Sequence, residues 1–191
     1  MSVLCIGLIL FLGIHSVSIV APAWRDAQAR QHGEWTWKGI YSLVALAGLV
    51  LVIIGYGLAR QSPVVLYTPP TALRHLAMLL MLPVFPLLFA AYLPGRIQRA
   101  AKHPMLLAVK LWATAHLLAN GNLADVLLFG SFLAWAVADR ISVKRRALPR
   151  SVPGAPPGPL NDIAAAAGGL VVYVGVLFSA HAWLTGVPLL G

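Results

Sequence analysis

Residues 3–23 read VLCIGLILFLGIHSVSIVAPA, a run whose only ionisable side chains are Cys5 and His15. At a rise of about 1.5 Å per residue, about 20 apolar residues in a helix cross about 30 Å of hydrocarbon. The run also lacks the basic start and the small-residue cleavage site that are typical of a signal peptide. We therefore expect it to be retained as a membrane-spanning helix.

Five further apolar runs follow, so the predicted fold class is all-α: a polytopic membrane helix bundle with six transmembrane helices. The additional spans are residues 39–59, 76–95, 104–120, 123–138 and 163–190. Pro83 and Pro86 should kink the third span, because proline removes a backbone donor. The fourth and fifth spans are short and are joined by Asn120-Gly121-Asn122, which predicts a short helical hairpin.

The composition excludes several classes of protein. The 191 residues are 60% hydrophobic and 10% charged, whereas soluble domains carry roughly a quarter charged residues. The net charge of +9 does not indicate nucleic-acid binding, because the basic residues lie between apolar runs rather than on one aqueous surface. A single cysteine, Cys5, excludes a disulfide framework and a site with several thiolate ligands.

The basic residues of the loops predict the orientation of the chain in the membrane. On one side the loops carry only Arg60 and Arg74. The other side carries Arg25, Arg30, Lys38, Arg96, Arg99, Lys102, Arg140, Lys144, Arg145, Arg146 and Arg150. Because cytoplasmic loops are enriched in lysine and arginine, we expect a bacterial inner-membrane protein with both termini in the periplasm. The chain is then a single transmembrane domain, 1–191, with a cytoplasmic Pro/Gly-rich linker at 147–160.

Small residues indicate where helices approach one another closely. They occur as three pairs: Gly48 with Gly55, Gly130 with Ala134, and Gly168 with Gly175. We interpret each pair as a packing face within the bundle.

Two histidines lie deep in the predicted spans. His15 is about 12 Å from the cytoplasmic end of its helix and His116 is about 18 Å from the cytoplasmic start of its helix. His32, His75, His103 and His181 fall in a loop or near an interface. An ionisable side chain inside the bilayer indicates a functional site, and depth selects only His15 and His116. Asp125, by contrast, is interpreted as a charge favoured by the dipole at its helix N-terminus.

A haem would remove the cost of burying both imidazoles. Its two axial ligands have Cα atoms about 12 Å apart, which tolerates the difference in depth between the two histidines. Trp112, His116 and Asn120 recur at every fourth position, so Trp112 could form a ring wall and Asn120 a hydrogen bond to the outer imidazole nitrogen. The alternative is that each histidine makes an ordinary polar contact with a serine or a backbone carbonyl.

Several motifs resemble the NnrU family of bacterial membrane proteins over nearly the whole chain. They are Gly13-Ile14-His15-Ser16-Val17, Trp37-Lys38-Gly39-Ile40-Tyr41, His103-Pro104-Met105, Ala115-His116-Leu117-Leu118-Ala119-Asn120-Gly121 and His181-Ala182-Trp183-Leu184. The resemblance implies a link to denitrification and nitrogen-oxide reduction. That family is similar to zeta-carotene isomerase, a membrane enzyme that uses haem b for a cis–trans isomerisation.

In the isomerase the haem ligands are two histidines, and their motifs match His15 and His116 here. The resemblance thus implies haem b as cofactor, a lipophilic substrate, and redox or isomerase chemistry if the protein is an enzyme. One position departs from the isomerase, because Ala113 stands where the isomerase has a cysteine three residues before the second histidine. A thiolate ligand at that position is therefore absent.

Two other functions remain as alternatives. Residues 99–105 resemble the Arg-His-Pro element of membrane methyltransferases that use S-adenosylmethionine, although Lys102 and Leu106 replace the usual arginine and tyrosine, and the acidic pair downstream is missing. The chain could instead be a non-catalytic accessory factor for a respiratory nitrogen-oxide reductase. Binding of S-adenosylmethionine would indicate the first alternative, and co-purification with a reductase would indicate the second.

Overall fold

A computed structural model describes residues 1–145 and 154–190 of the chain. Throughout these two ranges the regular elements are helices, with one isolated β-bridge between Val65 and Asn122. Five of the described helical segments are long and apolar enough to cross a membrane, and Pro104–Ala119 is a shorter apolar helix. The all-α, multi-pass membrane fold predicted from the sequence is confirmed.

The helices group into two compact units, and each unit is built from two separate segments of the chain. The first unit comprises Met1–Pro69 with Ala119–Ala147, and the second comprises Pro70–Leu118 with Leu148–Gly191. Since neither unit is continuous in sequence, no single cut separates them.

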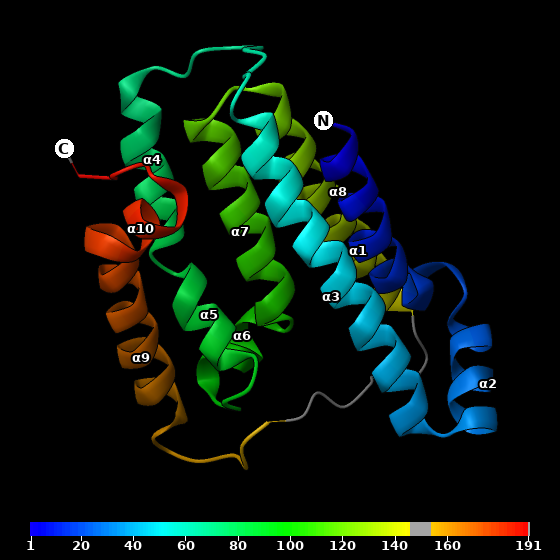
Figure 1. Ribbon diagram of the computed structural model, residues 1–191. Helices are drawn as coiled ribbons and strands as arrows, with labels where there is room; N and C mark the ends of the chain where they lie inside the picture. The colour runs from blue at the N-terminus through cyan, green and yellow to red at the C-terminus, as the bar shows by residue number, and fades with distance from the viewer. Residues whose placement is uncertain (146–153, 191) are drawn as a thin grey trace. The chain divides into compact units, whose positions relative to one another are not determined.

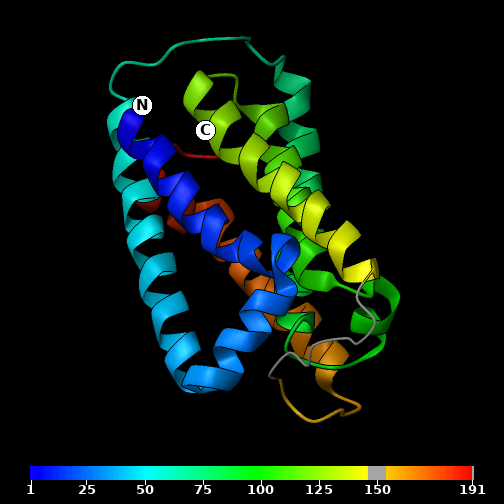
Figure 2. The same ribbon diagram turned by 90° about the vertical axis from the view of Figure 1, so that its right-hand side faces the viewer.

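The first unit contains α1 (Ser2–Val20), α2 (Pro22–His32), α3 (Glu34–Ala59) and α8 (Leu123–Arg145). α1 ends before Pro22, which opens α2 at a position where its missing N–H costs nothing. Gly33, with φ of 88°, then turns the chain into α3. The first predicted loop is therefore itself helical, and α2 folds back beside the start of α3 (Figures 1 and 2).

α1 and α3 approach so closely that three glycines are required, Gly48 and Gly55 of α3 and Gly7 of α1, where a Cβ atom would lie 2.5 Å from the backbone nitrogen of Val52. A Cβ atom on Gly48 would lie 2.6 Å from the backbone nitrogen of Phe11, and one on Gly55 would lie 2.3 Å from that of Leu4. The predicted packing face at Gly48 and Gly55 is confirmed. The prediction for Gly130 is wrong, because no described atom lies within 4 Å of a Cβ built there.

The far ends of α3 and α8 are joined through the connection that follows α3. Leu123 N–H donates to the Val64 carbonyl at 2.8 Å, and Leu66 N–H donates to the Gly121 carbonyl at 2.8 Å. Arg60 lies at this end of the unit. The basic residues of α2 and of the last turn of α8, and Lys38 in the second turn of α3, lie at the opposite end, as the loop charges predict.

The second unit contains α4 (Thr71–Met81), α5 (Val84–Ala90), α6 (Arg96–Ala101), α7 (Pro104–Ala119) and α9 (Asn161–Gly175). A π-helix, η1 (Val176–Ala180), and α10 (His181–Thr185) continue α9 (Figure 1). The predicted kink is confirmed, since the third span breaks between α4 and α5 at Leu82 and Pro83.

Packing in the second unit centres on α5. Val84 and Leu87 form a buried cluster with Ala108 of α7. A Cβ on Gly169 of α9 would lie 2.2 Å from the backbone nitrogen of Pro86. The sequence predicted this face at Gly168 and Gly175. A Cβ on Gly168 would lie 3.1 Å from the Phe89 ring, but no described atom lies within 4 Å of one on Gly175. The closest approach between α9 and α5 is therefore at Gly169, one residue after the predicted Gly168.

Polar contacts tie the start of α9 to α6. The Asp162 carboxylate accepts from Arg96 N–H at 2.8 Å and from Ile97 N–H at 2.9 Å. Asn161 Nδ2 donates to the Pro94 carbonyl at 2.8 Å. Residues 154–160 of the predicted linker are non-helical, as expected, and the remainder of that linker up to residue 153 lies outside the described residues.

Four of the predicted spans have ends that differ from the helix ends by five or more residues. The second, predicted from residue 39, begins at Glu34. The third span covers Thr71–Ala90 rather than 76–95. The last helix ends at Thr185 because Gly186 takes a left-handed conformation with φ of 72°. α8 continues to Arg145 rather than ending at residue 138, because charged residues outside the hydrocarbon do not interrupt a helix.

Candidate functional site

His15 is held on α1 by a hydrogen bond to the preceding helical turn. Its Nδ1 lies 2.6 Å from the carbonyl oxygen of Phe11, four residues earlier. Because a carbonyl oxygen only accepts, Nδ1 carries the hydrogen. In the neutral imidazole this leaves the lone pair on Nε2, the nitrogen that a metal would bind.

Aromatic rings from three helices surround the His15 imidazole. The ring centroids of Phe11, Tyr41 and Trp135 lie 4.3, 5.1 and 5.8 Å from that of His15. These rings come from α1, α3 and α8, so all of them belong to the first unit. The Trp135 indole N–H is buried and has no acceptor among the described residues. His15 thus lies among aromatic rings.

His116 repeats the arrangement on α7. Its Nδ1 lies 2.8 Å from the carbonyl oxygen of Trp112, four residues earlier, and the two ring centroids are 5.3 Å apart. The same argument assigns the hydrogen to Nδ1 and the lone pair to Nε2. His15 and His116 therefore have the same tautomer. Each donates to the carbonyl of the residue four positions earlier, and in each case that residue is aromatic.

Asn120, the third residue of the predicted stripe with Trp112 and His116, lies at the end of α7. The helix ends at Ala119, so Asn120 is the first residue after it. The outer imidazole nitrogen of His116 already has an acceptor in the Trp112 carbonyl. The Trp112 carbonyl thus orients the His116 ring, and Trp112 itself lies beside it, while the hydrogen bond predicted for the Asn120 side chain stays a prediction.

His15 lies in the first unit and His116 in the second. Each histidine, with the aromatic rings beside it, is called a half-site below. Neither unit builds a conventional metal cluster, since the described residues contain no group of three or more His, Cys, Asp or Glu side chains. A haem does not need such a cluster, because the macrocycle itself supplies four of the six ligands of the iron.

The other histidines lie in different settings. His32 ends α2, His75 lies within α4 and His103 precedes Pro104, the first residue of α7. His181 is the first residue of α10, and its Nδ1 lies 2.8 Å from the Val187 carbonyl and 3.2 Å from the Thr185 hydroxyl.

Asp125 serves the start of α8, as predicted from its position. Only 2% of its surface is exposed. Its carboxylate accepts from the Asn122 backbone N–H at 3.2 Å, from Asn122 Nδ2 at 3.0 Å and from the Tyr56 hydroxyl. Partial burial, and then the Asp125 charge, raise the pKa of the Tyr67 hydroxyl in the connection that follows α3. This cluster links α3 to α8 and has no feature of a catalytic site.

No curated protein and no solved structure matches the chain. A family model described as NnrU protein matches residues 3–189, which include both units and both half-sites. The chain therefore belongs to the NnrU family, membrane proteins linked as a family to nitrogen-oxide reduction.

Proposed function

We propose that this protein binds haem b, with His15 and His116 as the two axial ligands. The observation that carries the proposal is the bond from Nδ1 of each histidine to the carbonyl four residues earlier. Histidines that ligate a metal almost always donate their other ring N–H to a carbonyl, a carboxylate or water, which fixes the ring and makes Nε2 more basic. Both deep histidines meet this requirement within their own helix.

The surroundings of each half-site suit a haem. Phe11, Tyr41 and Trp135 around His15, and Trp112 beside His116, offer flat apolar surfaces for a macrocycle. The chain has a single cysteine and so lacks the two-cysteine motif for covalent c-type attachment. Two neutral imidazoles favour low-spin, non-covalently bound haem b.

The proposed chemistry is a redox step or a cis–trans isomerisation of a lipophilic substrate, in the setting of nitrogen-oxide reduction. A bound haem supplies one-electron redox chemistry. The chain's own part is to orient both imidazoles through the Phe11 and Trp112 carbonyls and to surround them with apolar groups that exclude water. Ala113 provides no thiolate to compete with His116 as a ligand.

The location and partners follow from the same proposal. We propose the bacterial inner membrane, with both termini in the periplasm, because eleven of the thirteen loop lysines and arginines fall on one side. The proposed partners are a lipophilic substrate that enters from the bilayer and a respiratory nitrogen-oxide reductase.

The experiment compares deep with shallow histidines. His15→Ala, His116→Ala, His75→Ala and His181→Ala variants would be purified from haem-replete cells, and haem would be quantified as the pyridine haemochrome. We expect the first two variants to lose most of their haem and the last two to keep it. Full haem content in both His15→Ala and His116→Ala, or loss confined to His181→Ala, would show that the wrong pair has been chosen. Binding of S-adenosylmethionine by a haem-free wild type would favour the methyltransferase alternative.

A further inference from the structure

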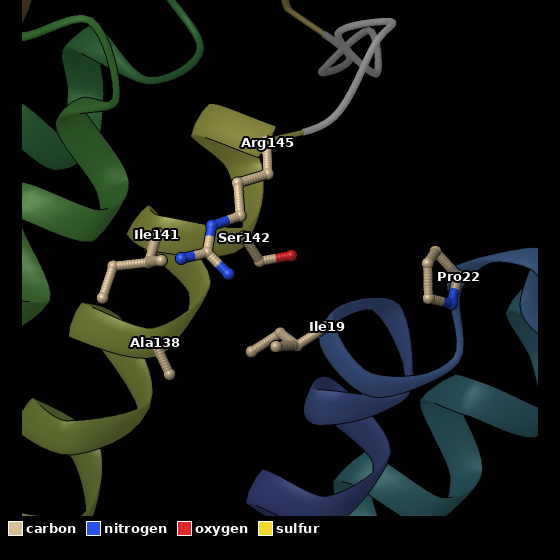
Figure 3. A pocket seen from close by; sticks show the side chains of 6 residues that line it. All are labelled: Ile19, Pro22, Ala138, Ile141, Ser142 and Arg145. Carbon is tan, nitrogen blue, oxygen red and sulfur yellow. The ribbon is translucent and has the colours of Figure 1, made fainter.

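A hollow of about 340 Å³ lies at the basic end of the first unit. Its lining comes from the end of α1, the start of α2 and the last two turns of α8 (Figure 3). The lining residues are Ile19, Pro22, Ala138, Ile141, Ser142 and Arg145. None of them belongs to the histidine half-sites.

Two features of the sequence create this hollow. α1 stops at Val20, and the chain turns away at Ala21 with φ of −133° and ψ of 57°, so α1 leaves space beyond its last turn. α8 continues past this level to Arg145. Positions 138, 141, 142 and 145 have the helical spacing that places side chains on one face, and that face borders the space.

The lining combines an apolar wall with one cation. Ile19, Ala138 and Ile141 supply the wall, and Figure 3 shows the Arg145 guanidinium extended back over Ser142 between these groups. In the part of the chain that the structure describes, no Asp or Glu forms an ion pair with Arg145. A guanidinium matches the geometry of a phosphate through paired N–H donors.

The level of the hollow in the membrane restricts what can occupy it. α1 and α8 are both long enough to span the bilayer, and the hollow lies beyond the last turn of α1 and beside the last turns of α8. This level corresponds to the boundary between hydrocarbon and headgroups. Ile141 remains 47% exposed and offers an apolar path from the hollow into the lipid. A phospholipid presents a phosphate and an acyl chain together at this level, whereas a soluble anion would leave the apolar wall uncovered.

We propose that this hollow is a binding site for an anionic phospholipid. The phosphate pairs with Arg145, and the first segment of an acyl chain lies against Ile19, Ala138 and Ile141. Lys144, in the same last turn of α8, adds to the local positive field without lining the hollow. This assignment is independent of the haem proposal, because it shares no residue with it.

Native mass spectrometry of the purified full-length protein tests the site. Delipidated protein in detergent would be titrated with dioleoyl-phosphatidylglycerol or dioleoyl-phosphatidylcholine, and the first bound lipid quantified. Arg145→Gln removes the proposed phosphate ligand. Lys144→Gln is its matched control, because it removes the same charge one residue away. Ile19→Trp fills the hollow and leaves the charge unchanged, and its folding would be checked by gel filtration.

For wild type we expect one phosphatidylglycerol bound about tenfold more tightly than phosphatidylcholine. Arg145→Gln and Ile19→Trp should remove this preference, while Lys144→Gln should change it by less than about twofold. Equal weakening by Arg145→Gln and Lys144→Gln would indicate diffuse attraction to the basic end and would overturn the site. Displacement of phosphatidylglycerol by millimolar inorganic phosphate would show a site for a free anion, and would overturn the lipid assignment.

Discussion

At the scale of single residues, the same type of hydrogen bond occurs at both proposed haem ligands. His15 and His116 each donate from Nδ1 to the carbonyl one turn earlier. A buried histidine in an ordinary polar contact would also donate such a bond, but the bond occupies only one of the two ring nitrogens. In this tautomer Nε2 carries the lone pair, and Nε2 is the atom through which each histidine would bind the proposed haem iron.

The buried Tyr56–Asp125 contact gives the first prediction about stability. Tyr56→Phe removes a donor to a carboxylate that is 2% exposed, so we expect a loss of about 1–3 kcal/mol in the free energy of unfolding. Thermal unfolding in detergent, followed by circular dichroism, would measure the loss. Tyr92→Phe is the control, because the Tyr92 hydroxyl makes no hydrogen bond within the described residues. Equal effects of the two variants would contradict the role given to Asp125.

At the scale of helices, close approach explains which glycines are needed. Gly55 and Gly57 lie two residues apart in α3 and therefore point in different directions. A Cβ on Gly55 would meet the α1 backbone at 2.3 Å, whereas no described atom lies within 4 Å of one on Gly57.

These two glycines form a matched pair for mutation. Gly55→Ala should destabilise the protein by about 1–3 kcal/mol, because α1 must move away from α3. Gly57→Ala should be neutral or stabilising by up to about 1 kcal/mol, because alanine favours the helix. Unfolding midpoints in detergent would separate them. The proposed α1–α3 packing fails if Gly55→Ala is as stable as Gly57→Ala.

The contact between the Asp162 carboxylate of α9 and the first backbone N–H groups of α6 gives a second prediction at this scale. Asp162→Ala leaves the backbone N–H groups of Arg96 and Ile97 without their carboxylate acceptor, which should cost about 0.5–2 kcal/mol. Limited proteolysis between residues 91 and 103 should accelerate in the variant. Asp26→Ala, which removes the ion pair with Arg25 in the other unit, is the control and should leave the rate of cleavage between residues 91 and 103 unchanged.

The sequence predicts the helical spans well because apolar runs of membrane length have few alternative structures. It misplaces the end of α8, since charge marks the edge of the hydrocarbon and not the end of a helix. The π-helix η1 was not predicted, because its five residues are as apolar as their neighbours. At the site, depth alone selected His15 and His116. Tyr41 and Trp135 were missed because aromatic neighbours from other helices depend on helix rotation, which spacing within one helix does not reveal.

At the scale of the whole molecule, most basic residues of each unit lie at one end of that unit, and a single arginine lies at the other end of its spanning helices. In the first unit Arg60 lies opposite the cations of α2 and α8, and in the second Arg74 of α4 lies at the far end of the α4–α5 span from α6. This separation is what a fixed orientation in the membrane requires.

The orientation can be tested with a reporter fused after Gly191. We expect green fluorescent protein at this position to stay dark and alkaline phosphatase to be active, because the proposed orientation places the C-terminus in the periplasm. Fusion of the same reporters after Arg145 should give the opposite pattern. Bright cells from the C-terminal fluorescent fusion would reverse the orientation and would move the proposed lipid site to the outer leaflet.

The central claim is that the two deep histidines hold one haem b. Its most direct test is the absorption spectrum of full-length protein purified in detergent from haem-replete cells, recorded oxidised and then reduced with dithionite. We predict a Soret band that shifts on reduction, with the sharp α-band of low-spin haem b. A colourless protein that gains no Soret band when hemin is added would contradict the account.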